Sequence, residues 1–160
     1  MDYVDIVFCH RPDNETPLEE TCRAMNDIID EGKSFYWGTS MWPADRIARA
    51  IELCTQKGWH IPITEQPPYS MIRREIVEKD YRRLYEDFKH GLTVWSPLQG
   101  GILAGKYNDG NIPQGSRYDL HGDFLKDTWG KYFGETTKEK TIKMLKGLEA
   151  LAKEQRYTQA

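Results

Sequence analysis

The sequence predicts an α/β fold built around a parallel sheet. Four short apolar segments alternate with amphipathic segments of helical spacing, and the apolar segments begin at residues 3, 34, 61 and 92. The resulting intervals of 31, 27 and 31 residues suit successive strand–helix units, because parallel neighbours need a crossover between them. With 39% hydrophobic and 29% charged residues, the composition is that of a globular protein.

The first unit is predicted as a buried strand over residues 3–8, followed by a helix. Residues 16–19, TPLE, have the form of a capping box with proline at the first helical position. Apolar residues then recur at helical spacing until Gly32, namely Leu18, Cys22, Met25 and Ile29. A helix with a marked start and stop is therefore expected.

The second unit pairs a strand over residues 34–38 with a helix that Pro43 opens and Gly58 ends. The apolar face of this helix consists of Ile47, Ala50, Ile51 and Cys54. Residues 61–64 predict the third strand.

The third helix is predicted over residues 74–90, and residues 92–96 predict the fourth strand. The apolar face of this helix consists of Val77, Tyr81, Leu84 and Phe88. Residues 100–134 then contain glycines, prolines and isolated aromatics without periodicity, which predicts a long loop of the functional or mobile kind. A last helix is predicted over residues 137–155, with an inward face of Met144, Leu148, Leu151 and Ala152.

Charge and hydropathy exclude several classes of protein. The net charge is −3 with both signs interspersed, so no basic stripe for nucleic acid is present. No apolar run is long enough to span a bilayer, so direct membrane insertion is not expected. No secretory signal follows Met1, which favours the cytoplasm. The cysteines Cys9, Cys22 and Cys54 lack metal-ligand spacing, so reduced and mostly buried thiols and no metal site are expected.

The number of strands is small for an independent parallel sheet. Four parallel strands alone leave two bare edges, and a closed barrel of eight strand–helix units takes roughly 250 residues. We therefore expect these 160 residues to be a fragment or part of a longer chain.

The chain contains four distinctive motifs, YVDIVFCHRPD, YWGTS, EQPPYSM and WSPLQGGILAGKY, in this order. Together they resemble the aldo-keto reductase superfamily, and most closely the branch with voltage-gated potassium channel β subunits and their bacterial relatives. The resemblance implies an incomplete (β/α)8 TIM barrel, with strands four to seven and a C-terminal helix. It further implies one partial barrel domain over residues 1–160, in which residues 100–134 form a long cofactor-side loop.

His10 is the catalytic candidate that the resemblance implies. Similar proteins reduce carbonyls by hydride transfer from NADPH, and their catalytic histidine closes strand four and orients the substrate oxygen. Their proton-donating tyrosine, with a lysine and an aspartate, corresponds to strands outside this chain. From its position alone, without the neighbouring motifs, a capping or core histidine would be the preferred interpretation of His10. In animal channel β subunits this position resembles an asparagine, so the histidine at residue 10 favours an ordinary reductase.

Three further residues would contact the nicotinamide, according to the resemblance. Ser40 and Gln66 match side chains that hydrogen-bond the carboxamide, and Trp95 matches an aromatic residue that stacks on the ring. The alternatives are a helix N-cap before Pro43 for Ser40, a solvated loop residue for Gln66 and a buried barrel tryptophan for Trp95.

The glycine-rich segment after the fourth strand is the candidate for the phosphate side of NADPH. Glycines let backbone N–H groups approach a pyrophosphate, and arginine suits a 2′-phosphate dianion. Alone, the two cations of this set are more often solvated surface charges. The positions implied by the resemblance are Ser96, Pro97, Leu98, Gly100, Lys106, Ser116 and Arg117.

Two functions follow from the resemblance. The first is an NADPH-dependent reductase of small aldehydes or ketones, active at full length and inactive as this fragment alone. The second is a channel β subunit-like protein or scaffold that uses the NADPH-binding barrel as a redox sensor or binding platform. Its partners would be further copies of the chain or a membrane channel.

Overall fold

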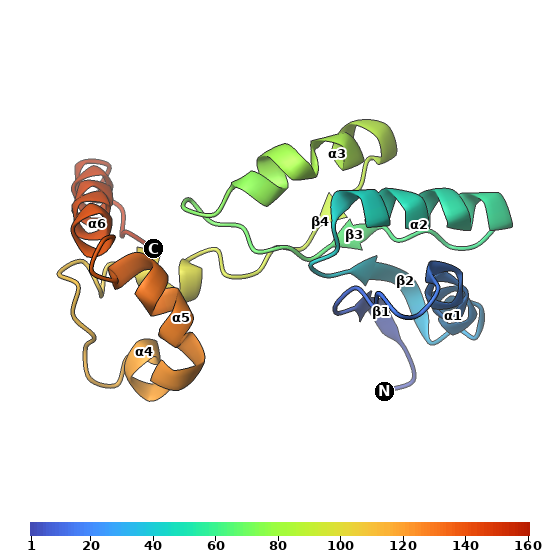
Figure 1. The fold of residues 1–160 in the computed structure, drawn as a ribbon, viewed down its shortest axis with the longest axis horizontal. Helices are drawn as coiled ribbons and strands as arrows, with labels where there is room; N and C mark the ends of the chain where they lie inside the picture. Colours follow the sequence, from blue (N-terminus) through green and yellow to red (C-terminus); the bar gives the residue numbers. More distant parts are fainter. The chain divides into compact units, whose positions relative to one another are not determined.

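The computed structural model describes residues 1–160, which form two compact units, Met1–Pro97 and Leu98–Ala160 (Figure 1). The first unit contains the whole sheet and its helices, whereas the second unit is helical. The boundary between the two units follows Pro97, the last residue of the WSP motif.

The sheet of the first unit is parallel, as the spacing of the apolar segments predicts. Its strands β1 (Val4–Cys9), β2 (Ser34–Thr39), β3 (Thr64–Glu65) and β4 (Gly91–Leu92) are hydrogen-bonded in sequence order. The last residues of the strands lie in one row, because Cys9 pairs with Thr39, Thr39 with Glu65, and Glu65 with Leu92. All four carboxyl ends therefore meet at one edge.

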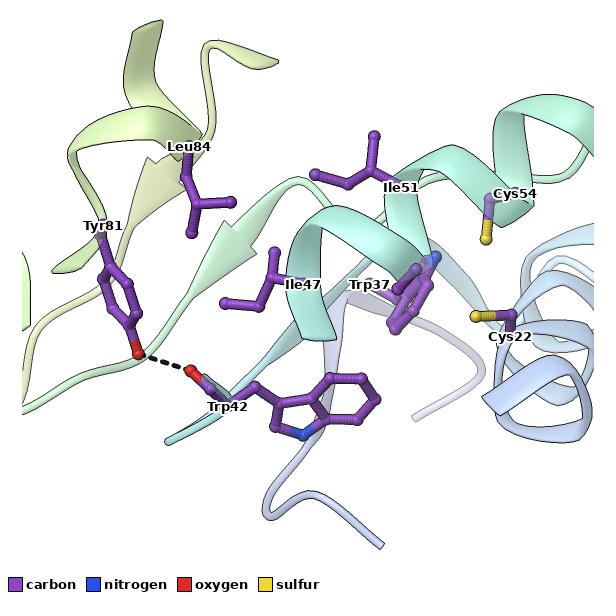
Figure 2. Packing of buried hydrophobic residues seen from close by; sticks show 9 residues of the cluster. Cys22, Trp37, Trp42, Ile47, Ile51, Cys54, Tyr81 and Leu84 are labelled. Carbon is purple, nitrogen blue, oxygen red and sulfur yellow. Dashed lines mark hydrogen bonds between the residues drawn. The ribbon is translucent and has the colours of Figure 1, made fainter. Parts of the chain in front are cut away.

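Three helices, α1 (Leu18–Asp30), α2 (Ala44–Lys57) and α3 (Arg82–Phe88), bury their apolar faces on one side of this sheet (Figures 1 and 2). Helix α2 follows Pro43 and ends at Gly58, whose φ of 70° lies in the left-handed region, so the predicted stop is confirmed. The core consists of Cys22, Trp37, Trp42, Ile47, Ala50, Ile51, Cys54, Tyr81 and Leu84.

The predicted capping box at the start of α1 is wrong. Pro17 is the N-cap residue, and no side chain caps the helix. The Thr16 hydroxyl donates instead to Asp13 Oδ2 at 2.7 Å, and the backbone N–H groups of Glu15 and Thr16 donate to Asp13 Oδ1. The Thr16 side chain is thus directed toward Asp13 in the preceding turn, and it does not cap the backbone N–H groups of α1.

The third and fourth strands are shorter or later than predicted. β3 begins at Thr64 instead of residue 61, because Pro62 has no N–H to donate to a neighbouring strand. β4 ends at Leu92 instead of residue 96, because the segment that follows β3 contains Pro67 and Pro68, which have no N–H to donate to β4. Beyond the two strands, Thr93 N–H still donates to Glu65 O at 2.9 Å, and an isolated bridge pairs Pro68 with Trp95.

The helix predicted over residues 74–90 is divided into two parts. A π-helical segment, Ile76–Asp80, precedes α3, and the predicted inward residues Val77, Tyr81 and Leu84 are buried. The wide turn brings the Tyr81 hydroxyl to the backbone of Trp42, at 2.7 Å (Figure 2).

The second unit corrects the prediction of a continuous loop over residues 100–134. It contains a 3₁₀ segment (Gln99–Ala104) and the helices α4 (Arg117–Leu120) and α5 (Gly122–Phe133). Aromatic contacts hold these elements together without any regular period along the sequence, since the rings come from Tyr107, Tyr118, Trp129 and Phe133.

Helix α6 (Lys138–Glu154) lies where the last helix was expected, but its buried face is different. Thr141 and Leu145 are buried, whereas Met144 is 37% exposed and Leu151 is 52% exposed. The second unit buries only a narrow stripe of this helix, so part of its apolar surface faces solvent. No helix of the structure has both the length and the apolar character needed to cross a bilayer.

Candidate functional site

Three predicted site residues lie side by side at the carboxyl edge of the sheet. His10, Ser40 and Gln66 each directly follow the last residue of β1, β2 and β3. The backbone continues the strand pairing there, since Ser40 N–H donates to Cys9 O at 3.0 Å and Gln66 N–H donates to the carbonyl of the residue before Ser40 at 2.8 Å. The parallel order of the strands therefore gathers these three residues in one row.

Ser40 is held firmly in this row. It is 1% exposed, and its hydroxyl donates to Gln66 O at 3.0 Å while accepting from Arg11 Nη1 at 3.3 Å. The N-cap of α2 is Pro43 and no side chain caps that helix, so the alternative of a capping serine is wrong.

His10 lies in the open at the end of β1. His10 is exposed, and its one hydrogen bond is formed by its backbone carbonyl, which accepts from Arg11 Nη1 at 2.5 Å. Within these 160 residues the side chain belongs to no core. The imidazole can therefore meet a ligand at the same edge as Ser40 and Gln66.

Trp95 reaches the same edge three residues beyond β4. Its N–H donates to Pro67 O at 3.0 Å, which holds the backbone beside the segment that follows Gln66. The ring is 37% exposed, and the guanidinium carbon of Arg73 lies 5.7 Å from its centroid. Within these 160 residues, Trp95 offers a ring face to a ligand.

Sequence reasoning missed Glu65, a fully buried carboxyl directly behind the row. Thr39 Oγ1 donates to Glu65 Oε2 at 2.5 Å, and Tyr81 OH lies 3.4 Å from Oε1. The backbone N–H groups of Met41 and Trp42 also bond to this carboxyl. We call these five residues the Glu65 network. An acidic residue at the end of a buried strand is the sequence signal that could have revealed it.

Burial raises the pKa of the Glu65 carboxyl, and the hydrogen bonds from Thr39, Met41, Trp42 and Tyr81 offset part of that shift. Burial also raises the pKa of Tyr81, with the Glu65 carboxyl as a second cause. Tyr81 therefore stays protonated and serves as a hydrogen-bond donor within the network.

The start of the glycine-rich segment has an unusual backbone. Ser96, Gln99, Gly100 and Gly101 have φ angles of 55°, 49°, 67° and 103°, all in the left-handed region. A Cβ on Gly100 would lie 3.1 Å from the hydroxyl of Tyr118, so a side chain would be crowded as well as strained. Such a turn exposes backbone groups that longer side chains would cover.

The remaining predicted residues, Leu98, Gly100, Lys106, Ser116 and Arg117, belong to the second unit. Lys106 and Arg117 are exposed and form none of the ion pairs of the structure. Ser116 is 8% exposed, and its hydroxyl has no hydrogen-bond partner within the chain. The hydroxyls of Thr64, Thr93, Tyr107 and Tyr118 are also buried without a partner, so a ligand contact at Ser116 stays a prediction.

The cysteines are free, and Cys22 and Cys54 are fully buried between α1 and α2 (Figure 2). Cys9 lies next to the candidate site, but burial raises the pKa of its thiol to about 11, with Cys22 as a second cause. Cys9 is therefore a thiol and not a nucleophilic thiolate at neutral pH.

Comparison with known proteins agrees with this geometry. The family model of the aldo/keto reductase family matches residues 1–160. A probable voltage-gated potassium channel subunit beta of Oryza sativa subsp. japonica is 44% identical over 154 residues, covering 96% of this chain and 45% of that protein. Another, from Arabidopsis thaliana, is 52% identical over 120 residues, covering 75% of this chain and 37% of that protein.

Among solved structures, the glycerol dehydrogenase AKR11B4 from Gluconobacter oxydans superposes on 99% of this chain and 44% of its own, with a TM-score of 0.74 and 23% identity. That likeness concerns the fold. This chain spans less than half the length of each of these relatives. The chain therefore belongs to the aldo/keto reductase family, on the branch of the voltage-gated potassium channel β subunits, and its fold is part of a (β/α)8 barrel.

Proposed function

We propose that the complete protein is an NADPH-dependent oxidoreductase that reduces aldehyde or ketone carbonyls. The observation that carries this proposal is the row of His10, Ser40 and Gln66 at the carboxyl edge of the sheet. Active sites of (β/α)8 barrels lie at this edge. Membership in the aldo/keto reductase family supports the same chemistry.

The residues of the first unit suit the nicotinamide end of NADPH. The Gln66 side chain is half-buried and forms no hydrogen bond within the chain, so its amide is available to the carboxamide of the ring. Ser40 offers a fixed hydroxyl beside it, and Trp95 offers an exposed ring face for stacking. We propose that this set determines which face of the nicotinamide is presented.

The glycine-rich segment and the residues that follow it suit the phosphate groups. We propose that backbone groups of Ser96, Pro97, Leu98 and Gly100 contact the pyrophosphate, with Lys106 as an added charge. Ser116 and Arg117 would bind the 2′-phosphate. The left-handed backbone at Gly100, the free hydroxyl of Ser116 and the unpaired charge of Arg117 support this assignment.

His10 would act on the substrate. NADPH, when bound, supplies the hydride. The exposed imidazole of His10 would donate a hydrogen bond to the carbonyl oxygen, which stabilises the charge that develops there. We propose that the proton donor comes from outside these 160 residues, as the resemblance implies.

A second candidate function rests on the relatives. Both plant proteins at 44% and 52% identity are named as probable voltage-gated potassium channel subunits beta. In this alternative, the complete protein binds NADPH as a redox sensor within an oligomer or on a membrane channel. Turnover of carbonyls would then be slow or absent, although NADPH binds.

The two functions are separated by His10→Ala and Arg117→Ala in the complete gene product. His10→Ala is expected to lower single-turnover hydride transfer to an aldehyde and to leave the NADPH affinity unchanged, because the imidazole contacts only the substrate. Arg117→Ala is expected to lower the preference for NADPH over NADH by about one to two decades, through loss of a charge-assisted bond worth roughly 1.5 to 3 kcal/mol.

Titration of cofactor fluorescence measures the affinity, and stopped-flow absorbance measures the transfer. If the unmutated protein binds NADPH and reduces no aldehyde or ketone, the reductase proposal fails and the sensor remains. If it binds neither NADPH nor NADH, both proposals fail.

A further inference from the structure

The Glu65 network lies directly behind the row of candidate site residues. Glu65 directly precedes Gln66 in the chain, and its strand partner Thr39 directly precedes Ser40. The buried carboxyl is thus covalently next to one member of the row and hydrogen-bonded to the residue before the other, at 2.5 Å. The Glu65 residue is therefore linked to the backbone of both Ser40 and Gln66.

The carboxyl also holds the turn that leads from β2 to α2. Met41 has a φ of 59°, which is unfavourable for a residue with a side chain. Such a conformation persists only where surrounding contacts hold it, and here the N–H groups of Met41 and Trp42 both bond to Glu65. Tyr81 fixes the other end of the turn, because its hydroxyl donates to Trp42 O at 2.7 Å (Figure 2).

This turn begins at Ser40, whose hydroxyl points to Gln66 O. Stability alone does not explain an acidic side chain at this place. A buried carboxyl is costly, and an apolar residue of similar volume would fill the core at least as well. What an apolar residue cannot do is accept hydrogen bonds from Thr39 and from two successive backbone N–H groups.

We propose that Glu65 is a positioning residue of the nicotinamide site, acting through Ser40 and Gln66. The proposal rests on the proposed binding of NADPH. The Glu65 carboxyl holds Met41 in its left-handed conformation, and this fixes the positions of Ser40, whose hydroxyl donates to Gln66 O, and of Gln66, from which both would contact the ring. The adenosine end of the nucleotide is not affected by Glu65.

The test uses the complete gene product and two ligands, NADPH and adenosine 2′,5′-bisphosphate, which lacks the nicotinamide. Glu65→Gln keeps the size of the side chain but places an amide donor against Thr39 or the backbone donors. We expect NADPH to bind about fivefold more weakly, as for the loss of one hydrogen bond, and the bisphosphate to bind as before.

A double-mutant cycle with Ser40→Ala tests whether Glu65 acts through Ser40. The double variant is expected to bind NADPH about as weakly as each single variant, because both changes remove the same contact. Hydrogen exchange at the amides of Met41 and Trp42 is expected to accelerate in Glu65→Gln. Ile51→Val, a small change in the core of α2, is the control and is expected to change neither ligand affinity.

Thr39→Val removes the shortest bond of the network without changing the shape of the side chain, and it replaces Glu65→Gln if that variant does not fold. Equal weakening of NADPH and bisphosphate, full additivity with Ser40→Ala, or unchanged NADPH affinity would each overturn the proposal. If the unmutated protein binds the bisphosphate but not NADPH, the nicotinamide site itself is refuted, and the proposed function fails together with this inference.

Discussion

At the scale of single residues, burial shifts the pKa values of titratable side chains. His90 is an example besides Glu65, because it is 7% exposed and its Nε2 has no hydrogen-bond partner. Burial lowers the pKa of His90 from 6.5 to about 4. Between about pH 4 and pH 6.5, the imidazole of His90 is therefore neutral in the folded protein and protonated in the unfolded chain.

His90 is expected to make the stability of the fold depend on pH. Between pH 6.5 and about 4, the unfolded state binds a proton that the folded state excludes, so the free energy of unfolding decreases as the pH falls. The loss amounts to at most about 3 kcal/mol. Urea unfolding of the complete gene product at pH 7.5 and 4.5 measures it.

His90→Gln is expected to remove most of this difference between the two pH values, because glutamine does not titrate. His121→Gln is the matched control, since His121 is exposed and its replacement should leave the difference unchanged. An equal loss of stability in unmutated protein and His90→Gln would show that other groups cause the pH dependence.

At the scale of helices and strands, glycine is required at two positions for different structural reasons. A Cβ on Gly38 in β2 would lie 2.7 Å from both Thr64 O and Thr64 Cγ2, and 2.8 Å from Phe8 Cε1. Gly58 at the end of α2 has a φ of 70°, and a Cβ there would meet no atom within 4 Å. Glycine is required at position 38 by the close packing between strands, and at position 58 by the left-handed backbone conformation.

Alanine at these two positions is expected to give different losses of stability. Gly38→Ala should cost about 3 kcal/mol, because the clash with Thr64 involves backbone and β2 must move away from β3. Gly58→Ala should cost about 1 kcal/mol, as for any left-handed residue with a side chain. Thermal unfolding of both variants measures the two values, and a larger loss at Gly58 would contradict this explanation.

At the scale of the whole molecule, the first unit has a single layer of helices on its sheet. Large apolar side chains in the sheet and next to it remain in contact with solvent, since Phe35 and Tyr36 of β2 are 59% and 52% exposed and Tyr3, just before β1, is 55% exposed. The chain also spans less than half of its relatives. In the family fold, further strands of a barrel continue such a sheet.

The 160-residue chain expressed alone is expected to be inactive, to bind a hydrophobic dye and to self-associate, because exposed apolar surface and unpaired strand edges promote association. Size-exclusion chromatography and dye fluorescence test this, with Tyr36→Lys as a variant that should reduce both signals. A monomer with a cooperative melting transition would contradict the expectation.

The sequence by itself determined the alternation of strands and helices and the parallel sheet, and it placed His10, Ser40 and Gln66 shortly after three predicted strands, whereas the resemblance to a family was needed to single them out as site residues. These features follow from local patterns, because apolar period, proline and glycine act within a few residues, and parallel strands bring their carboxyl ends to one edge. The ends of helix α2 at Pro43 and Gly58 were predictable for the same reason.

Only the tertiary structure decided the Glu65 network, the shortened β4 and the buried face of α6. Glu65 finds its donors in Thr39 and Tyr81, which are 26 and 16 residues away along the chain. Met144 and Leu151 have the helical spacing of an inward face, but packing in the second unit buries Leu145 instead. Such choices depend on which distant groups meet in space, and no local period of the sequence contains that information.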